Sequence, residues 1–242
     1  MAVNFGNNIS NRYSATSSII SASDPRPVTV MCKFKATARG QRHTIFCNNA
    51  SSAPRFYVEI FFSGANDFLR LYSNGFVQGS NFTLSTSAVT SLGWTWAADN
   101  SVAFFVNGAA SGTTTKTVAG TGTAGSRIAG LGLAIAGFTN NGDQSELAVW
   151  SAVLPLANHA EYHAGVSPKL IRPDVLEMHA PLVDNPTSFE DLVGSVTYTK
   201  VGTVTKAPHA PMFYPSRPHI ITAPAAAPPA GTILPHMMHM AA

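Results

Sequence analysis

The chain has 242 residues, enough for one β-sandwich with an appendage or for two small domains. Only 11% of the residues are charged, the net charge is +3, and no basic run occurs, so we expect no nucleic-acid partner. No stretch of about 18 apolar residues is present, so we expect no membrane span. The first residues lack the pattern of a secretory leader, which predicts synthesis in a host or parent cytoplasm.

Short strands with turn signals between them are predicted for most of the chain up to residue 150. Residues 28–35 and 56–62 each alternate between two sets of side chains. Turn residues follow at positions 63–67, 98–101 and 107–110. Alternation with a period of two between such turns is typical of antiparallel sheets that pack as a sandwich or barrel.

Cys32 and Cys47 lie on either side of a polar turn around residues 39–41. A hairpin centred between Arg39 and Gly40 would place the two cysteines directly opposite one another, both pointing inward. For a chain made in a cytoplasm we expect two reduced thiols in the core. A cross-strand disulfide is the alternative.

Residues 155–165, PLANHAEYHAG, have a helical pattern. Pro155 suits the first turn and Gly165 suits the stop. His159 and His163 could share one helix face, but zinc needs further ligands and Glu161 lies off that face. We therefore predict polar residues on a hinge helix and no bound metal or cofactor, with a histidine metal site as the alternative.

The composition changes at residue 207, where prolines begin to recur and charge nearly disappears. We predict a sandwich domain over residues 1–206 and an extended C-terminal arm over residues 207–242, because the prolines prevent a helix or central strand. The arm is rich in apolar side chains, which favours burial on a neighbouring surface. The predicted partner-binding residues are Met212, Phe213, Tyr214, Arg217, Ile220, Ile221, Ile233, Leu234, Met237 and Met238.

Three segments resemble concanavalin A-like domains of the laminin G-like kind. They are the opening strand and loop from residue 3, the stretch LGWTWAADNSVAFFVNG at residues 92–108, and the stretch SELAVW at residues 145–150 with the helical segment after it. The resemblance covers roughly residues 3–200 and implies an all-β, antiparallel jelly-roll sandwich with one short helix. It also implies that Trp150 fills the core, and it suggests calcium at the oxygen-rich loops 139–144 and 97–101, with ordinary turns as the alternative.

An element that usually opens such domains comes late here, at residues 176–204. This order resembles structural proteins of tailed bacteriophages that carry concanavalin A-like domains. The resemblance implies a non-enzymatic virion protein on the capsid surface, namely a capsid decoration or cement protein. Its expected partners are the major capsid protein and sister subunits, in a dimer or trimer.

A carbohydrate-binding module of a phage head or tail fibre is the alternative function. Trp94 and Trp96 share one strand face and could stack on a glycan, although the family pattern places them in the core. Glycosidases of this fold use paired glutamates in an E-x-D-x-x-E pattern, which is absent, so we expect no catalysis. An exposed aromatic side chain would favour carbohydrate binding, and paired carboxylates would favour a degenerate glycosidase.

Overall fold

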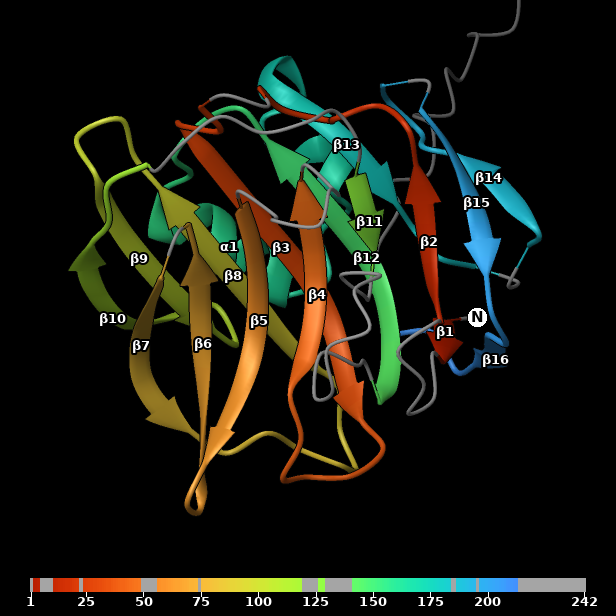
Figure 1. Ribbon diagram of the computed structural model, residues 1–242, viewed down its shortest axis with the longest axis horizontal. Helices are drawn as coiled ribbons and strands as arrows, with labels where there is room; N and C mark the ends of the chain where they lie inside the picture. Colours follow the sequence, from red (N-terminus) through yellow and green to blue (C-terminus); the bar gives the residue numbers. More distant parts are fainter. Residues whose placement is uncertain are drawn as a thin grey trace, which may run out of the picture.

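The computed structural model describes residues 2–4, 11–21, 24–48, 56–73, 75–118, 126–128, 141–183, 186–194 and 196–212. These residues form two antiparallel sheets packed face to face, a jelly-roll sandwich of the predicted class (Figure 1). Sheet A lies behind sheet B in this view. No helix among the described residues is long and apolar enough to span a bilayer.

Sheet A has the order β10-β9-β8-β3-β12-β1-β16, and β13 also pairs with β12. Its strands are β1 (Ala2–Asn4), β3 (Val28–Ala36), β8 (Thr90–Trp96), β9 (Ser101–Val106), β10 (Ala109–Thr115), β12 (Gly142–Trp150), β13 (Leu176–Ala180) and β16 (Thr205–Ala207). The last strand contains residue 207, so regular structure crosses the position at which the composition changes.

Sheet B has the order β14-β15-β2-β11-β4-β5-β6-β7. Its strands are β2 (Arg12–Ala15), β4 (His43–Asn48), β5 (Phe56–Ser63), β6 (Asn66–Tyr72), β7 (Phe76–Phe82), β11 (Ser126–Ile128), β14 (Ser188–Glu190) and β15 (Thr197–Val201). Strands β4 to β7 follow one another as hairpins, because turn residues separate segments of matched alternation.

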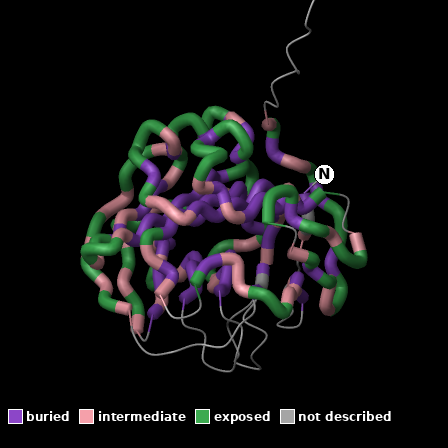
Figure 2. Tube along the Cα trace, turned by 90° about the horizontal axis from the view of Figure 1, so that it is seen from above, coloured by how far each residue is buried: buried purple, intermediate pink, exposed green. Residues whose placement is uncertain are grey.

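The main core fills the space between the sheets, and Figure 2 shows buried residues through the middle of the molecule. Strand β3 illustrates the pattern, since Val28, Val30, Cys32 and Phe34 all belong to this core. Their neighbours on the opposite face of β3 include Met31, which packs in a second cluster. Both faces of β3 are therefore covered, as its burial shows.

The predicted hairpin between residues 28 and 48 is wrong. Strand β3 pairs with β8 on one edge and with β12 on the other, so no edge remains for β4. The chain instead crosses from sheet A to sheet B at the turn containing Gly40, whose φ is +83°. Cys32 points into the main core, whereas Cys47 packs with Tyr57 in a separate cluster; both thiols are buried and they do not form a disulfide with each other.

A second, smaller core covers the outer face of sheet A, beneath α1 (Leu156–His163) and the 3₁₀ turns η1 (Pro168–Leu170) and η2 (Pro173–Val175). The helix begins after Pro155 and ends before Gly165, whose φ is +97°, as predicted. Trp150 is buried in this outer cluster rather than in the sandwich core. Its Nε1 donates to the Ile171 carbonyl at 2.7 Å, which satisfies the indole.

A β-bulge interrupts β12 at Glu146, whose φ is +53°. Before the bulge, Asp143 and Gln144 pair with β1; after it, Leu147 pairs with Ala180 of β13. One edge of β12 thus serves two partner strands in turn. The change of partner places the Glu146 side chain in a fully buried position.

Candidate functional site

Trp94 and Trp96 do share one strand face, but that face points into the main core. Their exposed fractions are 1% and 0%, so the expected core position is confirmed and the alternative, that they stack on a sugar, does not hold. Each pairs across to an inward residue of β3, Trp94 with Val30 and Trp96 with Val28. Trp96 also stacks on Phe56 of the opposite sheet, with ring centroids 5.9 Å apart.

His159 and His163 both face sheet A, in structural positions. The His159 ring stacks on Phe105 at a centroid distance of 3.6 Å, directly over Gly93, and burial lowers its pKa to about 3. His163 Nδ1 lies 2.8 Å from Ser91 Oγ. Within the described part of the chain, no three His, Cys, Asp or Glu side chains are grouped to hold a metal ion.

In each of the two candidate calcium loops, one carboxylate oxygen accepts hydrogen bonds from protein groups. Asp99 Oδ1 accepts bonds from the backbone nitrogen and the hydroxyl of Ser101, as in an ordinary turn. Asp143 Oδ1 accepts from Asn4 Nδ2 at 2.6 Å. Residues 139–140 lie outside the described residues.

The predicted arm is described only at its beginning. Ala207 pairs with Ala2, and Met212 packs against the second core of the same chain. The remaining predicted contact residues lie outside the described residues: Phe213, Tyr214, Arg217, Ile220, Ile221, Ile233, Leu234, Met237 and Met238. Partner binding by the arm therefore stays a prediction.

Two buried glutamates lie on different sheets, each with its own cationic or histidine partners. Glu59 of β5 is bonded by Arg42 through two nitrogens, at 2.8 and 3.2 Å. Burial raises the pKa of Glu59, and Arg42 opposes this shift. Glu146 of β12 contacts His179 Nε2 at 2.8 Å and His209 Nε2 at 2.9 Å. Both glutamates are fully buried and bonded to these partners. The two catalytic carboxylates of a glycosidase instead face each other across the bound substrate.

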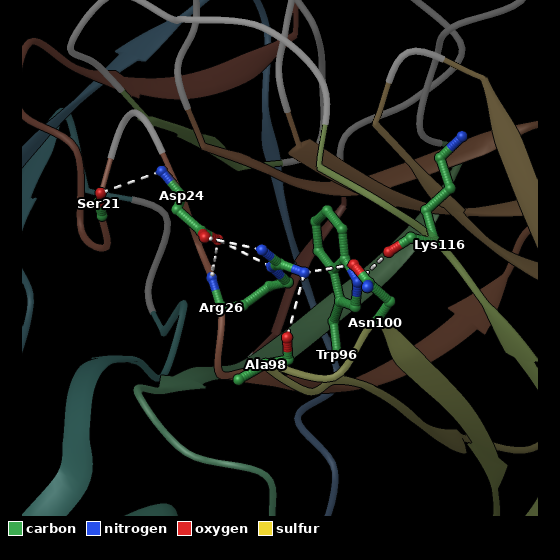
Figure 3. Close-up of polar contacts among 7 residues, drawn as sticks. All are labelled: Ser21, Asp24, Arg26, Trp96, Ala98, Asn100 and Lys116. Atoms are coloured by element: carbon green, nitrogen blue, oxygen red, sulfur yellow. Dashed lines mark hydrogen bonds and ion pairs between the residues drawn. The ribbon is translucent and has the colours of Figure 1, made fainter.

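A polar network closes one end of the sandwich around Arg26 (Figure 3). Its guanidinium pairs with Asp24 at 2.9 Å and bonds the Ala98 carbonyl and Asn100 Oδ1. The ring of Trp96 lies beneath it, 5.7 Å from the guanidinium carbon. This hydrogen bonding holds the pKa of Asp24 below its usual value. The network joins the loop before β3 to the turn between β8 and β9.

Two hollows flank this network. One, of about 260 Å³, is lined by residues that include Asp24, Ser151 and Glu177. The other, of about 420 Å³, is lined by residues that include Asn100 and Lys116. Both have mixed polar and apolar linings, and neither contains an exposed aromatic ring.

An aromatic–arginine patch lies on the outer face of sheet B, over β5, β6 and β7. We define it as Arg42, Glu59, Phe61, Arg70, Tyr72, Phe76 and Gln78. The strand register creates it, since outward residues of neighbouring strands stand side by side: Glu59 pairs with Arg70, and Arg70 with Gln78.

The two arginines of the patch lie close to two phenylalanine rings. Arg70 Cζ is 3.3 Å from the Phe61 centroid and 4.9 Å from that of Phe76. Arg42 Cζ is 5.4 and 5.2 Å from the same rings. Contacts of this kind are favourable and restrict the guanidinium orientation. Phe76 remains 39% exposed, although it also packs edge-on against Tyr72.

Sequence reasoning did not identify this patch. Alternation along residues 55–62 does place Glu59 and Phe61 on one face, but it cannot say which face is outward. The other members come from β6, β7 and the residue before β4, and only the folded sheet brings them together. The missed signal was an arginine within an aromatic-rich strand, Arg70, and a second arginine directly before a strand, Arg42.

No known protein family and no curated protein matches this sequence. Two solved structures are similar in fold. A candidate carbohydrate-binding protein from Bacteroides ovatus superposes with a TM-score of 0.64 at 16% identity, covering 88% of this chain and 62% of that one. A heptameric SAP-like pentraxin from Limulus polyphemus gives 0.54 at 16% identity, covering 66% of this chain and 80% of that one.

The chain thus corresponds to less than two thirds of the length of the Bacteroides ovatus protein. At this level of identity, the similarity establishes a shared fold. The predicted antiparallel jelly-roll sandwich is confirmed, and within the described residues one short α-helix follows β12, as expected.

Proposed function

We propose that this protein is a non-enzymatic carbohydrate-binding module that contacts its glycan through the aromatic–arginine patch. The observation that carries the proposal is the exposed ring of Phe76, bordered by Arg70 and Gln78 on a sheet surface. The C–H face of a sugar ring is apolar and packs well on an aromatic ring, whereas its hydroxyls need hydrogen-bonding groups at the edge. The patch offers both kinds of contact.

The fold supports this proposal, because the similar Bacteroides ovatus protein is described as a candidate carbohydrate-binding protein. The buried positions of Glu59 and Glu146 favour binding over hydrolysis. The sequence resemblance gave three further hypotheses, which are separate from this proposal. They are capsid decoration, an arm that contacts capsid proteins, and a location on a phage fibre. Among the described residues, no contact favours capsid decoration over carbohydrate binding.

A panel of neutral and acidic oligosaccharides, screened by calorimetry or surface plasmon resonance, tests the proposal. We expect saturable binding to at least one oligosaccharide, weakened about tenfold or more by Phe76→Ala, which corresponds to roughly 1.4 kcal/mol. Leu170→Ala is the matched control, because Leu170 is also apolar and 50% exposed but lies on η1 beside sheet A. Melting curves check that both variants fold.

Absence of saturable binding across the panel would contradict the proposed function. Equal binding by the wild-type protein and Phe76→Ala would contradict the assignment of the patch.

A further inference from the structure

Arg70 differs from the arginines of the described residues that pair with a carboxylate. Four arginines have a carboxylate within ion-pair distance: Arg26, Arg39, Arg42 and Arg172. Arg70 has none among the described residues. Its Nε donates to Gln78 Oε1 at 3.0 Å. The two terminal nitrogens of Arg70 have no hydrogen-bond acceptor among the residues that the structure describes.

The position of the Arg70 guanidinium is nevertheless well defined. Phe61 lies against it at 3.3 Å, Phe76 is 4.9 Å away, and Gln78 holds Nε. Ordering a long side chain before a ligand arrives reduces the conformational entropy lost on binding. A fixed guanidinium presents two parallel N–H groups, which is the geometry that a carboxylate accepts best.

The neighbouring charges favour an anion at this position. Glu59 stands beside Arg70 in the register of β5 and β6, and Arg42 bonds both of its oxygens. Glu59 and Arg42 therefore largely neutralise each other, and the patch keeps the positive charge of Arg70. Partial burial lowers the pKa of Arg70, yet a guanidinium stays charged at neutral pH.

We propose that Arg70 makes this patch selective for a carboxylate-bearing sugar, whose acid group binds the terminal nitrogens of Arg70 while its ring packs on Phe76. This inference rests on the proposed function and narrows the ligand to acidic glycans. Two nitrogens donating to one carboxylate form a charge-assisted pair, which is stronger than bonds to neutral hydroxyls. Binding should therefore weaken as ionic strength rises.

The test compares matched pairs of probes with the full-length protein. Galacturonic acid trisaccharide is paired with galactose trisaccharide, and sialyllactose with lactose; a sulfated galactose trisaccharide distinguishes carboxylates from other anions. We expect at least one acidic sugar to bind tenfold or more tightly than its neutral partner. Arg70→Gln should abolish this preference. Arg70→Lys should keep less than half of it, measured as the logarithm of the ratio of the two affinities, because lysine keeps the charge but not the paired nitrogens.

Lys169→Gln is the charge control, since it removes one exposed positive charge on η1 without touching the patch. It should leave the preference unchanged, and unfolding curves should show that Arg70→Gln is folded. Binding of neutral sugars without an acidic preference would overturn this inference and leave the proposed function standing. Tight binding of the sulfated probe alone would overturn the carboxylate assignment, and an acidic preference that survives Arg70→Gln would overturn the role of Arg70.

Discussion

The carboxylate of Glu146 lies 2.8 Å from His179, and both side chains are fully buried. Its second oxygen contacts His209, which follows β16. One carboxylate at a bulge in β12 thus connects β13 and the segment after β16. Breaking such a buried interaction from one side is costly, because it leaves a charged or polar group without its partner.

Shortening the chain should therefore have an effect that depends sharply on the end point. A chain ending at residue 206 loses the contact between His209 and Glu146 and the packing of Met212 against the second core, so we expect a loss of roughly 3–5 kcal/mol in the free energy of unfolding. A chain ending at residue 212 keeps these contacts and should unfold close to the full-length protein. Urea titrations of the two truncated chains test this, and equal stabilities would contradict it.

Gly93 is required by the packing of α1 on sheet A. A Cβ atom at this position would lie 2.5 Å from His159 Nδ1, so Gly93→Ala should destabilise the protein by about 1–3 kcal/mol. Removing the obstructing ring with His159→Ala should make the two changes less than additive. A double-mutant cycle from chemical denaturation measures this coupling, and simple additivity would argue against the close contact.

The short helix could be predicted from sequence because its signals are local. Pro155 precedes it and Gly165 adopts the left-handed conformation that ends it. The pairing of β3 depended instead on distant segments. A polar turn near Gly40 is present as expected, but β8 and β12 occupy both edges of β3, and no local pattern reveals such competition.

The same limit applies to the candidate site. Alternation correctly placed Trp94 and Trp96 on one face, while the identity of that face came from packing between the sheets. Arg70 becomes distinctive only when Phe61, Phe76 and Gln78 are brought beside it by the register of three strands. Residue types alone did not distinguish it from arginines that pair with carboxylates.

The two cysteines should be unreactive in the folded protein. Cys32 lies in the main core and Cys47 in the Tyr57 cluster, both with no exposed surface, and burial raises the pKa of Cys32. Since the thiolate is the reactive form, an aromatic disulfide reagent should modify neither thiol under native conditions and both in denaturant. Rapid modification of either thiol in the folded protein would contradict the structure. So would finding that only one of the two thiols reacts after unfolding.

His159 should make the protein less stable in acid. Burial lowers its pKa to about 3, below the ordinary value near 6.5, so the unfolded chain binds the proton more tightly than the folded one. The stabilisation is fully present above about pH 6.5 and is lost as the pH falls toward 3, at up to about 1.4 kcal/mol per pH unit. His43, whose pKa burial lowers to about 4, acts in an overlapping range.

His159→Phe isolates this contribution, because phenylalanine can keep the stack on Phe105 but cannot be protonated. The variant also loses the hydrogen bond between His159 and Leu154, which should lower its stability by the same amount at every pH where His159 is neutral. This loss shifts the curve of stability against pH without changing its slope. We therefore expect the free energy of unfolding of His159→Phe to fall less steeply than that of the wild-type protein between pH 6.5 and 4.5. Urea titrations across this range measure the two slopes. His163→Gln serves as the control, because His163 is exposed and its replacement should leave most of the wild-type slope. Identical slopes for His159→Phe and the wild-type protein would show that His159 does not cause the loss of stability in acid.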